Sequence, residues 1–222
     1  MTARNRNNPL ALAVLITLFE GPKHPYEVAT TLRQRRKDDS VRLNYGSLYA
    51  VVASLERRGL ISAQGTAREG RLPERTVYGI TEAGGLEAHD WLAELISTPV
   101  KEYPVFEAGL SFLPALAPDE AVALLQERGE RLELQLAQVN GARELVEKRR
   151  FPRLFWVEAE FAATIMEAEL AFVRRLAAEI ASGGLSGVDW WRQLHADGDA
   201  AVVPPPIGDE WAASGDDEAD EG

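Results

Sequence analysis

Residues 42–61, RLNYGSLYAVVASLERRGLI, decide the fold of this chain. Apolar side chains recur in this stretch at the i, i+3, i+4, i+7 spacing of one helical face, and a glycine follows as a stop signal. The opposite face carries side chains suited to hydrogen bonding with phosphates or base edges. The stretch therefore predicts a short helix with one buried face (Leu48, Val51, Val52, Leu55) and one polar face (Tyr45, Ser47, Tyr49, Ser54, Arg57). An ordinary solvated surface helix is the alternative, and the flanking sequence decides between the two.

Two helices are expected before this stretch. Asn8-Pro9 can cap and start the first, and Gly21-Pro22 ends it. Its apolar stripe is expected at Leu10, Leu12, Ala13, Leu15, Ile16 and Phe19. His24-Pro25 opens the second helix, and the cations after residue 32 complement its dipole. The chain therefore enters residues 42–61 from a helical pair.

A hairpin and a fourth helix are expected after it. Residues 60–64 and 75–80 have strand patterns, and the Gly- and Arg-rich segment 65–74 joins them. Thr81 can cap a helix that reaches about Leu95. The apolar side of this helix is expected at Leu86, Trp91, Leu92 and Leu95. Three helices followed by a hairpin are the layout of a winged helix-turn-helix, whose third helix enters the major groove of DNA.

The order and spacing of these segments resemble the PadR family of transcriptional regulators over about residues 9–93. The matching segments are residues 12–15, 21–27, 46–49, 55–61 and 75–84. Pro25 departs from the glycine that the family often has, and Ala50 stands where proline is frequent. Neither change removes a polar group from the expected reading face. The resemblance implies that Asn44, Tyr45, Ser47 and Tyr49 lie at the DNA surface.

The expected DNA-contacting residues come from the starts of the second and third helices and from the hairpin. Backbone N–H groups and the positive dipole end of a helix favour a phosphate or a base acceptor, and Gly46 lets the backbone come close. The hairpin arginines are expected to approach phosphates or the minor groove. Tyr49 has an alternative place in the core with its hydroxyl at the rim. The full set is Lys23, His24, Tyr26, Arg42, Asn44, Tyr45, Gly46, Ser47, Tyr49, Arg68, Arg71 and Arg75.

An all-α region is expected over residues 96–197. After Pro99 and Pro104, a short helix at 105–113 and two long helices from Pro118 and Arg153 are predicted. The first long helix carries a heptad-like seam, and so much apolar surface needs a partner. The resemblance implies that this region forms a dimer interface. The expected dimerisation residues are Leu125, Leu132, Leu136, Val139, Phe161, Ile165 and Phe172. Trp156, Trp190 and Trp191 either belong to the core or line an effector pocket.

Charge is unevenly divided along the chain. The net charge of −11 is the balance of about +3 on residues 1–93 and about −14 on residues 94–222. The overall acidity therefore does not exclude DNA as a partner of the first part. From about Asp197 on, Pro204-Pro205-Pro206 and the acidic run 216–221 predict a disordered tail.

Enzyme, metal and cofactor functions have no supporting motif. The chain has no Cys, and its three His are scattered at 24, 89 and 195, without an HExxH, a nucleophile elbow or a phosphate-binding glycine loop. No helical His accompanies Glu158, Glu160, Glu167 and Glu169, so an ion-pair face is predicted there rather than a metal site. No run reaches the ~18 apolar residues of a membrane span. We expect a soluble, cytoplasmic protein that is not an enzyme and binds no cofactor.

The expected architecture is mainly α with a small β-hairpin wing. It consists of a winged helix-turn-helix over residues 1–95, a helical dimerisation domain over 96–197 and an acidic tail over 198–222. The expected function is a homodimeric transcriptional repressor on an inverted-repeat operator in double-stranded DNA, and the family resemblance implies release by a small hydrophobic or aromatic effector. The alternative is a winged-helix module for protein contacts, which the weak charge of the first part permits.

Overall fold

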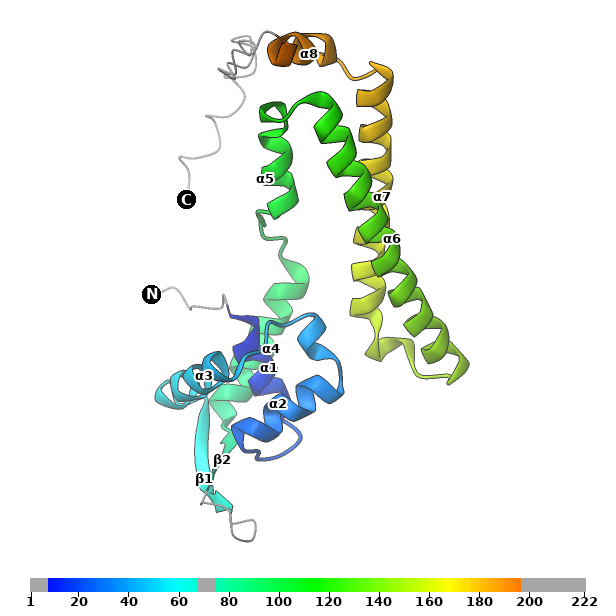
Figure 1. Cartoon of the computed structure of the whole chain (residues 1–222). Coiled ribbons are helices and arrows are strands. Elements are labelled where there is room, and N and C mark those ends of the chain that lie inside the picture. Colours follow the sequence, from blue (N-terminus) through cyan, green and yellow to red (C-terminus); the bar gives the residue numbers. More distant parts are fainter. Residues whose placement is uncertain (1–7, 68–74, 197–222) are drawn as a thin grey trace. The chain divides into compact units, whose positions relative to one another are not determined.

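The computed structural model describes residues 8–67 and 75–196. Within these residues the chain is mostly helical and has one antiparallel hairpin, which confirms the predicted fold class (Figure 1). The chain divides into two compact units, Met1–Glu102 and Tyr103–Gly222. Each unit is described by itself. The predicted acidic tail lies outside the described residues.

The first unit contains the predicted order of three helices, a hairpin and a fourth helix. β2 has the predicted bounds, whereas β1 starts one residue later and extends further than residues 60–64. The elements are α1 Pro9–Leu18, α2 Pro25–Gln34, the 3₁₀ turn η1 Lys37–Asp39, α3 Tyr45–Arg57, β1 Ile61–Ala67, β2 Arg75–Ile80 and α4 Glu82–Ser97.

α1 lies in the middle of this unit, where it contacts α2, α3, α4 and β2. It is therefore buried on almost all sides, with Val14 and Leu15 fully inaccessible, rather than along the single predicted stripe. The prediction is wrong for the last two residues of this stripe, because Ile16 and Phe19 are exposed. The helix ends at Leu18, so Phe19 follows it on the surface beside Gly85.

α3 buries the face that its sequence predicts. Leu48, Val51, Val52 and Leu55 are all buried and belong to the same core cluster as α1. Truncating a leucine at such a position costs about 2–5 kcal/mol of folding free energy. The buried face thus fixes which side of α3 is left for solvent and for partners.

α4 turns a different face inward from the one predicted. Trp91 is buried as expected, but Leu86, Leu92 and Leu95 are exposed. The remaining buried positions are the small Gly84 and Ala88, together with Glu87. Thr81, which caps the helix, ties its start to the end of α3 by donating from its hydroxyl to the Gly59 carbonyl oxygen at 2.8 Å.

The wing is a two-stranded sheet with one additional backbone contact. β1 and β2 pair from Ile61–Ile80 to Ala67–Arg75, with an irregularity between Ala63 and Gly65. Lys23, which precedes α2, exchanges two backbone hydrogen bonds with Tyr78 of β2, both 3.0 Å long. The loop before α2 is therefore joined to the wing.

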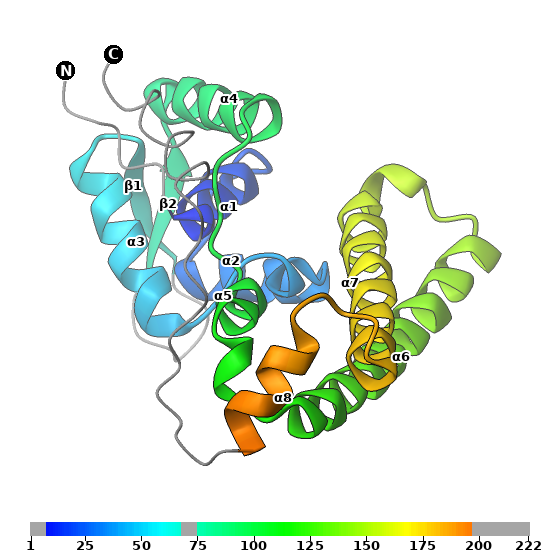
Figure 2. The ribbon, with the colours of Figure 1, turned by 90° about the horizontal axis from the view of Figure 1, so that it is seen from above.

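The second unit is a helical hairpin with shorter helices at one end. The long α6 and α7 lie side by side (Figures 1 and 2), and α8 contacts α6 near its start. Trp191 of α8 donates its indole N–H to the carbonyl oxygen of Leu116 at 2.8 Å. The elements are α5 Val105–Ser111, the 3₁₀ turn η2 Leu113–Ala115, α6 Pro118–Lys148, the 3₁₀ turn η3 Arg153–Phe155, α7 Val157–Ser182 and α8 Val188–Ala196.

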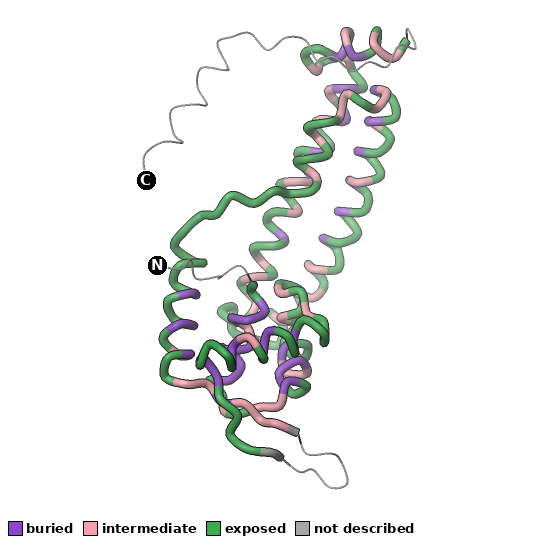
Figure 3. Tube along the Cα trace, turned by 90° about the vertical axis from the view of Figure 1, so that its left-hand side faces the viewer, coloured by how far each residue is buried: buried purple, intermediate pink, exposed green. Residues whose placement is uncertain are grey.

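The predicted dimer seam on α6 is wrong, because this seam packs within one chain. Leu125, Leu132 and Leu136 are buried, in clusters that include residues of α7. Figure 3 shows buried positions, in purple, along both long helices. Val139 is half-buried against the same clusters. Of the residues expected at the dimer interface, Phe161, Ile165 and Phe172 on α7 are exposed. Heptad spacing showed that the α6 face is covered but not that α7 covers it.

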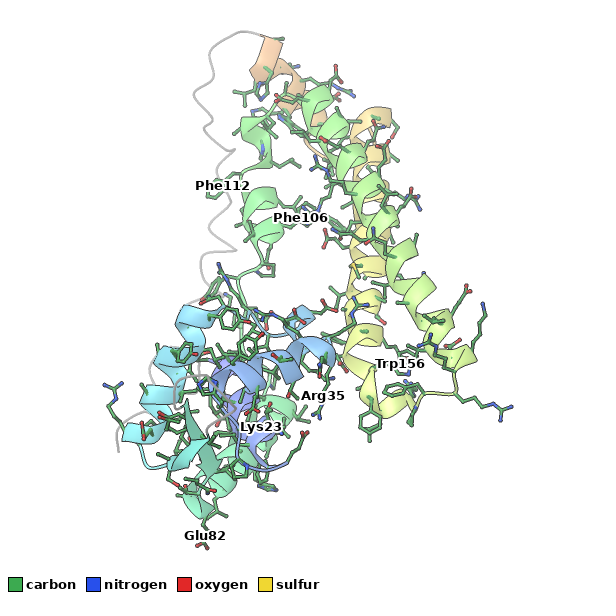
Figure 4. The ribbon with its side chains drawn as sticks, turned by 60° about the horizontal axis from the view of Figure 1, so that its bottom comes forward. Lys23, Arg35, Glu82, Phe106, Phe112 and Trp156 are labelled. Atoms are coloured by element: carbon green, nitrogen blue, oxygen red, sulfur yellow. The ribbon has the colours of Figure 1, made fainter. Side chains whose placement is uncertain are left out.

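The three tryptophans that were expected to belong to the core or to line an effector pocket do not lie together. Trp156 immediately precedes α7 (Figure 4), whereas Trp190 and Trp191 belong to α8, beyond the other end of α7. A helix of this length spans about 39 Å. Trp191 is a core residue, and Trp190 packs against the same cluster. A cavity of about 370 Å³ lies instead between α5, η2 and α6, with Phe106 and Arg128 in its wall.

Candidate nucleic-acid interface

His24 caps α2 with its side chain. Its Nδ1 accepts from the backbone N–H of Tyr26 at 3.1 Å, and the carboxylate of Glu27 accepts from the His24 N–H at 2.6 Å. This reciprocal pair is a capping box, with histidine where serine or threonine usually stands. The Nδ1 atom of His24 is therefore engaged in the cap and cannot also accept a hydrogen bond from DNA.

Asn44 caps α3 in a similar way. Its Oδ1 accepts from the backbone N–H of Ser47 at 2.7 Å, so this N–H is used within the chain and is not available to a phosphate. The N–H groups of Tyr45 and Gly46 are in the first turn, where a helix offers them no internal acceptor. The Asn44 side chain keeps its amide N–H donors for a ligand.

The polar face of α3 is exposed to solvent. Gly46 and Ser47 are exposed, and the exposed fractions of Tyr45 and Tyr49 are 39% and 49%. Tyr49 is thus not the core residue that the alternative interpretation required. Since the apolar side chains of α3 are buried, its hydroxyl groups and first-turn backbone face outward together.

Tyr26, Arg33 and Tyr45 form a cluster between α2 and α3. The two tyrosine rings stack, with centroids 6.1 Å apart and planes 6° from parallel. The guanidinium carbon of Arg33 lies 4.6 Å from the centroid of the Tyr45 ring, and its NH1 donates to the Tyr45 hydroxyl oxygen at 2.6 Å. The sequence predicted Tyr26 and Tyr45 as site residues but assigned Arg33 only to the helix dipole. Its seven-residue spacing from Tyr26, two helical turns, was the signal that could have identified it.

Several cations near the ends of α2 are paired with acids. Arg35 and Lys23 (Figure 4) both form ion pairs with Glu20, and the hydrogen bonds from Arg35 are the main cause that lowers the pKa of the Glu20 carboxyl. Arg36 pairs with Asp39 at 3.0 Å. These pairs reduce the positive field that the second helix presents.

Tyr78 of β2 lies beside the start of α2 and is half-buried. Burial is the main cause that raises the pKa of its phenol, and the nearby carboxylate of Glu56 adds to the rise. The phenol therefore remains protonated well above neutral pH. It acts as a neutral donor next to α3.

The structure describes only some of the other residues that were predicted to contact DNA. Arg42 is exposed in the segment before α3. Arg75 begins β2, and Arg68 and Arg71 lie outside the described residues. The part of the interface that the geometry supports is thus the start of α2 with the exposed face of α3.

Neither a metal site nor a membrane span is found among residues 8–67 and 75–196. No group of three or more His, Asp or Glu side chains in these residues could hold a metal ion, and no helix in them is long and apolar enough to cross a bilayer. Glu160 and Glu169 form ion pairs with Arg153 and Arg128, as the predicted ion-pair face implied.

Comparisons with known proteins agree with this fold. Residues 14–90 match the model of the transcriptional regulator PadR-like family, which confirms the resemblance seen in the sequence. Bacillus subtilis PadR in complex with operator DNA matches with a TM-score of 0.65 and 20% identity, over 78% of this chain and 99% of that chain. The same protein in complex with p-coumaric acid matches with a TM-score of 0.63 and 19% identity, over 78% of this chain and 98% of that chain. The Vibrio cholerae virulence activator AphA matches with a TM-score of 0.57 and 15% identity, over 78% of this chain and 98% of that chain. No curated protein matches significantly.

Proposed function

We propose that this protein is a DNA-binding repressor that acts in the cytoplasm. The basis is the match of residues 14–90 to the PadR-like family of transcriptional regulators. The protein grips an inverted-repeat operator as a homodimer, with one α3 for each half-site. The observation that carries the proposal is the division of α3 into a buried apolar face and an exposed face of hydroxyl groups and first-turn backbone. The operator complex of B. subtilis PadR, which has the same fold, supports DNA as the ligand.

Removing hydroxyl groups from α3 should lower operator affinity without lowering stability. Ser47→Ala and Tyr49→Phe are each expected to cost about 1–3 kcal/mol of binding if the lost contact is to a base. Both side chains are exposed, so the melting temperature should stay within a degree or two of wild type. The measurement is fluorescence anisotropy with DNA selected from random sequence by the wild-type protein. Ser62→Ala in β1 is the matched control, because it removes an exposed hydroxyl from outside α3.

Gly46→Ala adds a steric variant to the same experiment. Its new Cβ would meet only Asn44 Oδ1, at 3.7 Å, so the helix accommodates it. A methyl group in the first turn should nevertheless keep a DNA backbone from approaching. If all three α3 variants bind the selected DNA as tightly as wild type, α3 is not the reading helix.

A winged domain used for protein contacts is the second candidate function. The pairing of Lys23, Arg35 and Arg36 with acids favours it, because these cations are then less available to phosphates. The two candidates differ in salt dependence. A DNA reader releases counterions and loses affinity steeply as salt rises. Binding of the selected DNA that is equally tight at 50 and 200 mM salt would favour the protein-contact function.

The exposed side of α7 is the proposed dimer interface. Phe161, Ile165 and Phe172 recur at helical spacing on one face and are 68%, 52% and 37% exposed. Large aromatic residues with this exposure are typical of interface cores. They take the place of the α6 seam, which is already covered by α7.

A charge on this face should separate the subunits without unfolding them. Phe161→Glu is expected to give a folded monomer at micromolar concentration, with weaker operator binding because the half-sites are no longer gripped together. Ala162→Glu is the matched control, since it places the same charge on the neighbouring exposed position. Sedimentation equilibrium and far-UV circular dichroism measure the two properties. A wild-type protein that sediments as a monomer would contradict the proposed dimer.

Release by a small aromatic or hydrophobic effector is the last part of the proposed function. The p-coumaric acid complex of B. subtilis PadR supports the class of ligand. The cavity between α5, η2 and α6 has a volume of about 370 Å³, which is within the usual range of small-molecule sites, and its polar groups include Arg128 and Arg131. We expect millimolar p-coumaric acid to raise the melting temperature and to release bound operator. An unchanged melting temperature would exclude this acid as the effector.

A further inference from the structure

Tyr45 is held by two residues of α2. Tyr26 and Arg33 are seven positions apart on this helix, which is close to two full turns, so both side chains project from the same face. Tyr45, the first residue of α3, contacts both: its ring stacks on Tyr26, and its hydroxyl and ring are in contact with Arg33. A side chain at the start of α3 is thus fixed from a neighbouring helix.

The hydrogen bond from Arg33 determines which role the Tyr45 hydroxyl can play. A guanidinium group only donates, so the phenol oxygen must be the acceptor in the 2.6 Å bond. The hydroxyl hydrogen is then directed away from Arg33. Since the Tyr45 side chain is 39% exposed, this hydrogen is available to an acceptor outside the chain. The bond comes from a charged donor, which also polarises the phenol and strengthens its own donation.

Tyr26 is anchored in turn by the cap of α2. Its backbone N–H donates to Nδ1 of His24, and its own ring is half exposed. The ring that stacks on Tyr45 therefore comes from the first turn of α2, and the hydrogen bond to Tyr45 comes from Arg33 in the last turn of the same helix. Rotation of the Tyr45 ring away from this position would break the contacts with both.

We propose that Arg33 is a positioning residue for DNA binding, which holds Tyr45 as a hydrogen-bond donor toward a phosphate oxygen of the operator. This inference rests on the proposed function. Phosphate oxygens are acceptors without donors, so they match a hydroxyl that can only donate outward. Arg33 acts through Tyr45 rather than as a phosphate contact of its own.

A double-mutant cycle tests this role. Arg33→Met removes the donor and keeps the length of the side chain, and Tyr45→Phe removes the hydroxyl and keeps the stack on Tyr26. Each single variant should weaken binding of the selected operator about tenfold. The double variant should be no weaker than Tyr45→Phe alone, because Arg33 then has no hydroxyl left to position. Arg35→Met is the matched control: it removes an equal charge nearby, and its effect should be the same in the wild-type and Tyr45→Phe backgrounds.

The outcomes separate this proposal from the proposed function. If wild type binds DNA and the losses of Arg33→Met and Tyr45→Phe multiply in the double variant, Arg33 contacts DNA independently and the positioning role is wrong. The role is also wrong if either single variant binds as wild type does. If wild type selects no DNA at all, it is the proposed function that fails. Melting curves accompany each titration, and Arg33→Leu, which also lacks a hydrogen-bond donor, replaces Arg33→Met if the latter melts below wild type.

Discussion

Alanine in place of Gly84 is expected to destabilise the winged domain by about 3 kcal/mol or more. A Cβ at this position would overlap the carbonyl oxygen of Leu60 and lie 2.9 Å from its carbonyl carbon. The obstacle is backbone, and it cannot move aside easily because the Leu60 oxygen accepts from the Thr81 N–H at 3.1 Å. Overpacking of a tight core costs about 1–3 kcal/mol and sometimes more, and a clash with fixed backbone belongs at the upper end. Urea denaturation measures the loss.

The neighbouring glycine provides the control for this prediction. A Cβ at Gly85 would lie 3.7 Å from the ring of Phe19, an ordinary van der Waals distance. Because glycine inside a helix costs about 1 kcal/mol relative to alanine, Gly85→Ala should leave stability unchanged or raise it slightly. Equal urea midpoints for the two variants would show that α4 does not approach Leu60 as closely as described.

Leu132→Glu is expected to unfold the helical hairpin of the second unit. Leu132 is buried in a cluster with Leu136 and Leu170, so the substitution loses apolar packing and places a carboxylate among aliphatic side chains. Losing the leucine alone costs about 2–5 kcal/mol, and an unpaired buried charge adds several more. We expect a large loss of helical signal in far-UV circular dichroism and non-cooperative melting of the second unit.

Leu134→Glu distinguishes this effect from a general intolerance of charge on α6. Leu134 is two residues away and 67% exposed, so the carboxylate would stay in water. This variant should melt within about 0.5 kcal/mol of wild type, as exposed substitutions usually do. If Leu132→Glu were equally well tolerated and the protein only lost its dimer, the α6 seam would face a second subunit after all.

Local signals in the sequence were sufficient to predict most elements of the fold. Asn8 and Thr81 cap α1 and α4 with their side chains, and the apolar spacing of α3 gives its buried face correctly. α4 was predicted with the wrong face because its close contacts use Gly84 and Ala88, whose small size permits approach but adds little hydrophobicity. Periodicity identifies large apolar residues, and here most of these residues lie on the exposed side.

The candidate site could be predicted by position but not by role. The sequence identified Asn44 and His24 as DNA contacts, whereas both caps use side-chain acceptors that cannot at the same time bind DNA. A helix cap and a DNA contact require the same residue types at the same position, the start of a helix. The spacing of residues in the sequence therefore cannot tell one role from the other. Arg33 was missed because its partner, Tyr45, lies on another helix. Pairing across helices depends on tertiary packing, which no local pattern contains.

The contact between Lys23 and Tyr78 has a consequence for how copies of this protein meet one another. A two-stranded sheet has two outer edges, and an unpaired edge can template strand pairing with another chain. Lys23 occupies the outer edge of β2 at Tyr78 with hydrogen bonds in both directions. On the other edge, the irregularity between Ala63 and Gly65 interrupts the regular ladder of β1, and Gly65 has a φ of 136° that few other residues adopt. At Tyr78 and at Gly65 the described strands of the wing thus carry features that oppose edge-to-edge pairing, and these features lie outside its proposed role with DNA.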